Sequence, residues 1–342
     1  MRKLATIRKI DELRPIPGAD AIECAIVGGW TCVVKKGEFK EGDRAVYCEI
    51  DSWIPHEIAP FLSRGNFPRV YNDVKGERLR TVKLRGQLSQ GLLLPLEPTC
   101  ANIESELFEG LDVSLPLNIQ KWERPMNAQL AGMAKGNFPS LIPKTDQERV
   151  QNLKSEIAQA AEDRLEFEVT EKLEGSSMTV YLIDGEFGVC SRNLDLKETE
   201  DNTFWQVARR DGIEAKMRAS TPGNGFAIQG ELIGPGIQGN IYKLSKPEFR
   251  VFDVYSISGG YYLAPSNRRE FINVMGLLHV PVFKSAFMLT TETVADLLKM
   301  AEGKSVMGTI AGPEREGIVF KQVSGGMTFK AISNSYLLKS KD

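Results

Sequence analysis

The chain has 342 residues, of which 42% are hydrophobic and 26% charged, and its formal net charge is −2. This composition is typical of a globular protein with room for two domains. The small net charge excludes a basic field over the whole surface, so any nucleic-acid site must be a local patch. No apolar run reaches the length of a membrane span, and the start of the chain lacks the apolar core of a signal peptide. We therefore expect an intracellular, cytoplasmic protein without membrane contact.

The five cysteines are odd in number and lie far apart, without a C-x-x-C pair: Cys24, Cys32, Cys48, Cys100 and Cys190. This pattern favours free thiols in a reducing compartment over disulfides or a zinc site. The chain contains only two histidines, His56 and His279. Their small number argues against a His-rich metal site or a His-dependent catalytic triad.

Residues 1–116 alternate short apolar runs with turn signals. Strands are predicted over residues 22–27, 30–34 and 44–50, and a final strand over residues 86–96. Strands at this spacing with little helix indicate a small barrel or sandwich. The runs P-I-P-G-A-D and G-W-T-C-V-V-K-K-G-E-F-K-E-G-D resemble the OB-like modules attached to RNA-handling enzymes. We expect an OB-like, RNA-engaging domain over residues 1–116.

A basic run lies inside this first domain. Residues 64–85 hold seven basic side chains against the two acids Asp73 and Glu77, with Phe67 and Tyr71 between them: Arg64, Arg69, Lys75, Arg78, Arg80, Lys83 and Arg85. By charge alone, contact with phosphates and a solvated strand edge are equally well supported. The aromatic side chains could stack on bases or pack in the core. The residues we assign to RNA binding are Arg78, Arg80, Lys83 and Arg85.

Residues 117–144 carry Pro, Asn and Gly without a clear period and are interpreted as a connector. Thr145 and Glu148 form a capping-box pattern, so a helix is predicted to begin there. Further helices are predicted over residues 203–210, 266–278 and 291–301. Strands are predicted between them, over residues 187–190, 226–233, 249–255, 317–321 and 327–332. The second domain, residues 145–342, is therefore expected to be mixed α+β.

The stretch 167–181 alternates apolar and polar residues around T-E-K-L-E-G, which indicates strand, turn, strand with Lys172 at the mouth of a hairpin. A K-x-x-G tetrapeptide alone is a weak signal, typical of many surface turns. Five later segments strengthen it: S-R-N at 191–193, G-E-L-I-G-P-G-I-Q at 230–238, F-R-V-F-D-V-Y at 249–255, E-G-I-V-F-K at 316–321 and T-F-K-A-I-S at 328–333.

In order and spacing these segments resemble the six nucleotidyltransferase motifs of polynucleotide ligases and mRNA-capping enzymes. T-E-K-x-x-G with G-E-L-x-G-P-G-x-Q is similar to RNA ligases of the nick-sealing type, and the OB-like module ahead of them resembles the OB-first members. The resemblance implies that Lys172 attacks the α-phosphorus of ATP and forms lysyl-AMP. AMP then passes to an RNA 5′-phosphate, from which a 3′-hydroxyl displaces it. The implied partners are RNA ends in a nicked duplex, bound by a monomer.

The same resemblance implies a role for each motif residue. Glu171 would bind adenine, Glu231 the ribose, and Phe252 would stack on the base. Arg192 would contact ribose or RNA phosphate, and Arg149 the departing β,γ-phosphates. Lys321 and Lys330 would neutralise the α-phosphate. Glu174 and Glu316 would hold hydrated Mg²⁺ or Mn²⁺. A lysine amine of ordinary pKa needs activation, which we expect from burial, the metal and the cations Lys321 and Lys330.

Alternatives remain open for single residues and for the whole chain. Phe252 could be plain core, Glu316 a surface acid and Arg149 a solvated side chain. Two positions depart from the family pattern: Lys330 stands alone where many relatives have K-x-K, and Ser177 replaces an Arg or Asn. A DNA ligase or capping enzyme is expected to continue into an OB domain after the last motif, where this chain has only residues 331–342. A non-catalytic RNA-binding protein should have lost Lys172, and GTP in place of ATP stays possible.

Overall fold

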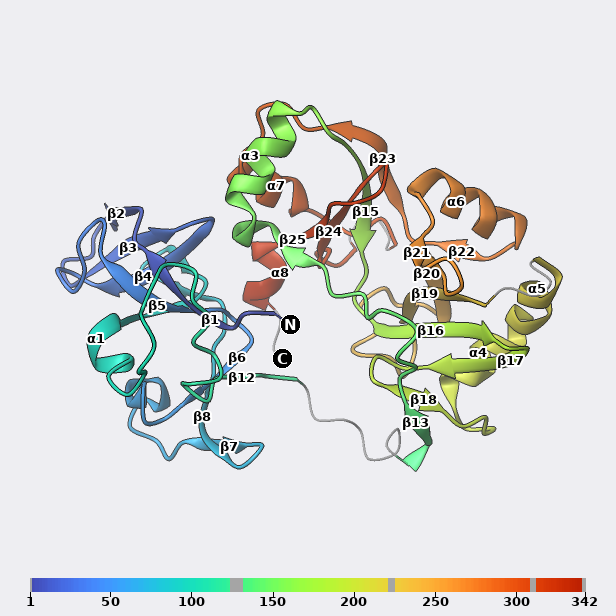
Figure 1. The fold of residues 1–342 in the computed structure, drawn as a ribbon, viewed down its shortest axis with the longest axis horizontal. Helices are drawn as coiled ribbons and strands as arrows, with labels where there is room; N and C mark the ends of the chain where they lie inside the picture. Colours follow the sequence, from blue (N-terminus) through green and yellow to red (C-terminus); the bar gives the residue numbers. More distant parts are fainter. Residues whose placement is uncertain (1, 124–131, 221–224, 308–311, 340–342) are drawn as a thin grey trace. The chain divides into compact units, whose positions relative to one another are not determined.

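The computed structural model describes residues 2–123, 132–220, 225–307 and 312–339. The chain divides into two compact units, Met1–Pro125 and Met126–Asp342, drawn in blue to teal and in green to red in Figure 1. The predicted boundaries were different. The interpretation of residues 117–144 as a connector is wrong for its described parts, because both ends belong to folded units. Residues 124–131 of that connector lie outside the described residues.

The ends of the predicted connector are folded for clear reasons. Leu117 and Ile119 are buried in the core of the first unit, and β12 (Gln120–Lys121) pairs with β6 (Ser52–Pro55). On the other side, β13 (Ala134–Asn137) pairs with β18 (Leu194–Leu196) of the second unit. The apolar side chains of this stretch are spaced too irregularly to show a period, and the Pro and Gly residues between them are typical of loops.

The first unit is built from short antiparallel strands. One sheet has the order β1 (Ala5–Lys9), β5 (Arg44–Cys48), β11 (Leu92–Pro95), and another the order β2 (Glu12–Pro15), β3 (Ile22–Val27), β4 (Trp30–Lys35). A third has the order β12, β6, β8 (Val74–Arg78), β7 (Arg69–Tyr71), and a hairpin joins β9 (Val82–Leu84) to β10 (Gln87–Ser89). Two short helices, η1 (Pro60–Ser63) and α1 (Leu96–Thr99), complete the unit.

The single strand predicted over residues 86–96 is wrong in detail, since β10 and β11 are separate strands in different sheets. The break falls at Gly91, whose φ of 142° lies in the region that favours glycine. A Cβ at this position would clash with the Tyr47 ring. The chain therefore turns where only glycine fits.

The second unit contains two sheets. The larger one has the order β13, β18, β17 (Glu186–Cys190), β16 (Ser176–Ile183), β19 (Phe226–Ile233), β20 (Glu248–Ser256), β21 (Tyr261–Tyr262), with β22 (Leu278–His279) parallel to β20. The other has the order β14 (Glu148–Arg149), β25 (Thr328–Ile332), β24 (Gly317–Gln322), β15 (Glu166–Lys172), β23 (Val282–Met288). Strands β15 and β16 follow each other in the chain but belong to different sheets, as Figure 1 shows.

Helices cover both sheets. The larger sheet packs on α4 (Thr203–Arg210), α5 (Ile213–Ser220) and α6 (Pro265–Val274), which bury Trp205, Met217 and Ile272 in one core. The smaller sheet packs on η2 (Val150–Asn152), α3 (Lys154–Glu162) and α7 (Val294–Ala301) around Phe167, Phe320 and Phe329, and α8 (Asn334–Lys339) follows β25. The bounds of α4 and β19 are those that the sequence predicts. None of the helices in the described residues is both long and apolar enough to cross a membrane.

The helix predicted to begin at Thr145 begins instead at Lys154. Glu148 does not complete a capping box: its carboxylate accepts hydrogen bonds from the backbone N–H of Arg149 and from Asn152. Residues 148–149 pair with the free edge of β25 as a strand. A capping box does form at Thr293 and Asp296, at the start of α7.

Candidate active site

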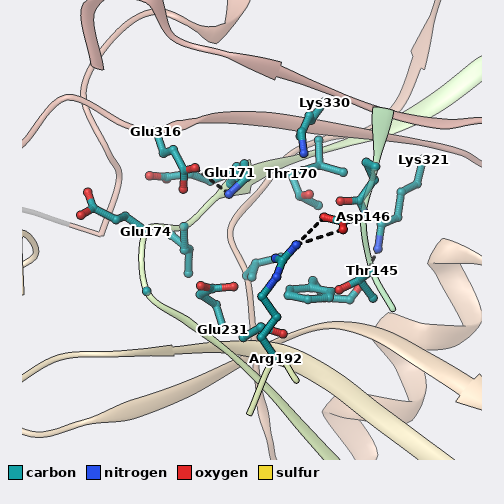
Figure 2. Close-up of a pocket in the computed structure, with 18 of the residues that line it drawn as sticks. Thr145, Asp146, Thr170, Glu171, Glu174, Arg192, Glu231, Glu316, Lys321 and Lys330 are labelled. Atoms are coloured by element: carbon teal, nitrogen blue, oxygen red, sulfur yellow. Dashed lines mark hydrogen bonds and ion pairs between the residues drawn. The ribbon is translucent and has the colours of Figure 1, made fainter. Parts of the chain in front are cut away.

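A cavity of about 280 Å³ opens in the second unit, and side chains from both of its sheets line it. Nine of the predicted site residues meet there: Glu171, Lys172, Glu174, Arg192, Glu231, Phe252, Glu316, Lys321 and Lys330. Figure 2 shows that the acids Glu174 and Glu316 lie on one side of the cavity and the cations Lys321 and Lys330 on the other. The motifs are far apart in the sequence, and the two sheets bring them together.

Lys172 is the last residue of β15 and pairs with Gly317 of β24. The chain then crosses to the other sheet at Gly175, where a Cβ would clash with the backbone oxygen of Leu232. Lys172 Nζ lies 2.7 Å from Glu316 Oε1, and its side chain is 26% exposed. Burial alone would lower the pKa of Lys172, but Glu316 and Glu231 outweigh burial and leave that pKa raised. In the ligand-free cavity the two carboxylates thus oppose the activation that we expect from burial, the metal and the neighbouring cations, and that expectation stays a prediction.

The carboxylates of the cavity differ in their surroundings. Burial, the largest cause, raises the pKa of Glu231 to about 8, and Glu316 and Glu174 add to the shift by repulsion. Glu171 is 1% exposed and accepts a hydrogen bond from the Val306 N–H, and burial raises its pKa as well. A cation placed among these acids would relieve their repulsion. Carboxylate oxygens are the donors that Mg²⁺ and Mn²⁺ prefer, so the residues fit such an ion. No group of three metal-ligating side chains is already assembled among the described residues.

Lys321 lines the cavity with a buried side chain that contacts Phe252 and Asp253. Its Nζ lies 2.6 Å from Asp253 and donates to the Phe252 carbonyl at 2.7 Å. The same nitrogen is 5.4 Å from the centre of the Phe252 ring. Burial lowers the pKa of Lys321 to about 8, although Asp253 opposes the shift. Asp253 also lies 3.6 Å from Arg268, which pairs with the buried Glu168.

The segment Thr145–Gln147 forms a wall of the cavity that sequence reasoning missed. Asp146 accepts two hydrogen bonds from Arg192, at 2.8 and 2.9 Å, and Figure 2 shows the two side chains reaching toward each other. Lys144 donates to Asn193 at 2.7 Å, which attaches the same segment to the larger sheet. The run K-T-D-Q-E-R predicts a helix start by its capping pattern, and that interpretation hides the role of Asp146.

Arg149 is not among the residues that line the cavity. It lies on β14, opposite Lys330 of β25, and it is 6% exposed. The predicted helix start placed it on a first turn, with a solvated side chain as the alternative to phosphate contact, and pairing with β25 buries it instead. Its assignment to the departing phosphates stays a prediction.

The four residues assigned to RNA binding have different surroundings. Arg78 forms an ion pair with Asp51 at 2.8 Å and lies 3.6 Å from the centre of the Trp122 ring, so it is held within the first unit. Arg80, Lys83 and Arg85 are exposed, the last two at the hairpin between β9 and β10. Arg78 is therefore held in place by contacts within the fold, whereas Arg80, Lys83 and Arg85 are exposed.

Comparison with known proteins agrees with this architecture. A family model described as an OB-fold domain matches residues 4–96, and one described as RNA ligase matches residues 165–335. The search of curated proteins gives no match.

Solved structures of Naegleria gruberi RNA ligase are similar to the chain along its length. An apo variant is 45% identical with a TM-score of 0.91, covering 100% of this chain and 99% of that one. A variant with AMP and Mn is 46% identical with a TM-score of 0.91, covering 100% of both chains. A structure with PPi is 46% identical with a TM-score of 0.89, covering 98% of both. The chain belongs to the RNA ligase family and carries its ligase domain behind an N-terminal OB-fold domain.

Proposed function

We propose that this RNA ligase uses ATP and a divalent metal to join a 3′-hydroxyl to a 5′-phosphate at nicks in duplex RNA, through lysyl-AMP and RNA-adenylate intermediates. One observation carries the proposal: Lys172 lines a cavity that has Glu174 and Glu316 on one side and Lys321 and Lys330 on the other. Such a cavity can take a polyphosphate at its cationic side and a metal at its acidic side.

In the first step the Lys172 nitrogen forms a bond to the α-phosphorus of ATP, and the bond from that phosphorus to the β-phosphate oxygen breaks. The amine must first lose a proton, and the carboxylate within hydrogen-bond reach of it is Glu316, at 2.7 Å. Lys321 and Lys330, which line the cavity, would offset the negative charge that grows on the phosphate. Relatives that contain ATP or AMP together with Mn support both ligands.

Nucleotide recognition is assigned to Glu171, Glu231 and Phe252, which line the cavity. Glu171 and Glu231 offer carboxylate acceptors for the adenine amino group and the ribose, and Phe252 presents a half-buried ring. Glu174 and Glu316, with Glu231 beside them, would hold Mg²⁺ or Mn²⁺. That ion would supply positive charge next to the reacting phosphates.

The RNA would be engaged by the OB-fold domain as well as by the cavity. The three exposed cations Arg80, Lys83 and Arg85 support this division of work. We infer that a monomer carries out the covalent step, because the residues assigned to that step all lie within the second unit. All five cysteines are buried free thiols, in keeping with a reducing, cytoplasmic environment.

The test is incubation of the protein with ATP labelled at the α-phosphate and a divalent metal, followed by denaturing electrophoresis. We expect a labelled covalent adduct that is absent from Lys172→Ala and present in Lys197→Ala, a change at an exposed lysine outside the cavity. An adduct that survives in Lys172→Ala would remove Lys172 from this role. Labelled GTP and nicked RNA or DNA duplexes, tested in parallel, determine the nucleotide and the substrate.

A further inference from the structure

Phe67 is the most exposed large hydrophobic side chain in the described residues, at 97%. It lies in the loop between η1 and β7, at the start of the basic run of the OB-fold domain. The other aromatic residue of that run is held within the fold, since Tyr71 packs on Trp53 with ring centres 5.4 Å apart and donates to the Lys121 carbonyl. Of this pair, only Phe67 presents its ring to solvent.

The segment around Phe67 in the sequence is rich in basic residues. Arg64, Arg69 and Lys75 are exposed around it in the sequence, and Lys75 pairs across the hairpin with Val70, itself 63% exposed. Glu77 of the same hairpin forms an ion pair with Arg69, and Asp73 lies in the turn of the hairpin, so Arg64 and Lys75 leave this loop and hairpin with a small net positive charge. An apolar ring among cations suits a ligand that offers both a flat π-face and negative charge.

We propose that Phe67 stacks on an unpaired RNA base while the neighbouring cations contact the adjoining phosphates. The inference rests on the proposed function, because it takes RNA as the substrate. Bases inside an A-form duplex are already stacked on both faces, so away from the duplex ends a protein ring can stack only on an unpaired base. The base would therefore lie outside the paired strands that meet at the nick, in an overhang or a loop, and a gap in a binding probe would mimic it.

The position of the ring in the fold supports this role. β7 is the edge strand of the sheet β12-β6-β8-β7, so the hairpin that follows Phe67 is paired on one side only. Arg64 adopts a left-handed conformation with φ of 51° and Gly65 follows with φ of 79°. These two residues turn the chain out of η1 and into the exposed loop that carries the ring.

The experiment measures binding of the full chain to two RNAs, a nicked duplex with all bases paired and the same duplex with a three-nucleotide gap. Stacking on one base is worth about 1–3 kcal/mol, so Phe67→Ala should weaken binding of the gapped RNA roughly 5- to 150-fold. Binding of the fully paired RNA should stay unchanged. Leu115→Ala is the matched control, since Leu115 is 89% exposed in the same unit but lies outside the basic run.

The dependence of RNA affinity on salt concentration distinguishes the contribution of the Phe67 ring from that of the cations. Phe67→Ala should leave the slope of log affinity against log salt unchanged, whereas Arg64→Gln should reduce it by about one phosphate contact. Phe67→Trp should keep the preference for the gapped RNA. Equal affinities of Phe67→Ala and the native protein for gapped RNA would overturn the proposal. A second outcome would also overturn the proposal. If sedimentation shows that the native protein self-associates and that Phe67→Ala abolishes this association, the Phe67 ring contacts protein rather than RNA.

Failure of this inference and failure of the proposed function are distinguishable. Phe67 lies in the first unit and all residues that line the cavity lie in the second. Phe67→Ala should therefore form the labelled adduct at the native rate. If Phe67→Ala forms the adduct at the native rate and binds gapped RNA as the native protein does, only the stacking role is rejected. If the native protein itself forms no adduct, the proposed function is rejected.

Discussion

Lys172 Nζ and Glu316 Oε1 lie 2.7 Å apart, so the proposed nucleophile and a proposed metal-holding acid form an ion pair in the ligand-free cavity. The pair keeps the lysine as an ammonium ion, since its pKa is raised despite burial. A lysine in this state cannot attack phosphorus. The ion pair must therefore separate when nucleotide and metal enter. Glu316 would then exchange the Lys172 ammonium for the metal as its partner.

The first prediction tests this dependence. Glu316→Ala and Glu316→Gln should both slow adduct formation by orders of magnitude, because each removes a carboxylate that favours metal binding next to the reacting phosphate. The measurement is the single-turnover rate of labelled adduct formation at saturating ATP. Glu314→Gln is a close control: Glu314 pairs with Lys304 and Lys339 and does not line the cavity. A native rate in Glu316→Gln would mean that the charge of this residue is not needed.

A second prediction concerns the ion pair between Asp146 and Arg192, whose side chains are 53% and 46% exposed. Release of Arg192 from the acid should strengthen the attraction of the cavity for anions. Exposed pairs are worth about 0.2–1 kcal/mol, so Asp146→Asn should tighten pyrophosphate binding roughly 1.4- to 5-fold.

Titration calorimetry with pyrophosphate measures this change. Glu186→Gln, which breaks an exposed pair with Lys135 on the same sheet, serves as the control. Weaker binding by Asp146→Asn would show the opposite role, in which the acid holds Arg192 in its binding position.

Much of the site was predictable because its residues lie in short motifs with local signatures. T-E-K-L-E-G identifies a strand end by alternation and a following glycine, and the strand bounds 226–233 agree with the structure. Asp146 and the burial of Arg149 were not predictable in this way. Both depend on pairing between β14 and β25, which are separated by about 180 residues, and a local capping pattern at Thr145 indicated a helix instead.

The strand β23 shows another limit of sequence reasoning. Its side chains are mostly exposed, and only Phe283 and Phe287 are half-buried against the core. Two apolar residues four apart suit a helix and a strand equally well, so periodicity could not identify the element. Its place is determined by antiparallel pairing with β15, which is a tertiary contact.

The third prediction follows from the pKa of Lys321, which burial lowers to about 8. Below pH 8 the side chain is a cation that can offset phosphate charge, and above pH 8 it becomes neutral. Arginine stays protonated over this range. The ratio of kcat/KM for ATP in the native protein to that in Lys321→Arg should therefore fall as pH rises above about 8, because kcat/KM reports the free enzyme.

Adduct formation followed from pH 6.5 to 10 gives this ratio, and its use cancels the effect of Lys172 deprotonation on both proteins. Lys197→Arg, at an exposed position outside the cavity, should show a constant ratio. A constant ratio for Lys321→Arg would mean that the charge of Lys321 does not act on the nucleotide.

The last prediction divides the reaction between the two units. All residues that line the cavity lie in Met126–Asp342, so this fragment should form the labelled adduct. It should seal nicked RNA poorly, and it should also fail on pre-adenylylated RNA, because the missing contribution is RNA binding.

Reversing charge at Arg80, Lys83 and Arg85 in the full chain should mimic the deletion and flatten the salt dependence of sealing. Arg78 is left unchanged because its ion pair with Asp51 supports the fold. If the fragment sealed at the full-length rate across salt concentrations, the OB-fold domain would have no role in holding RNA, and its three exposed cations would be a solvated edge.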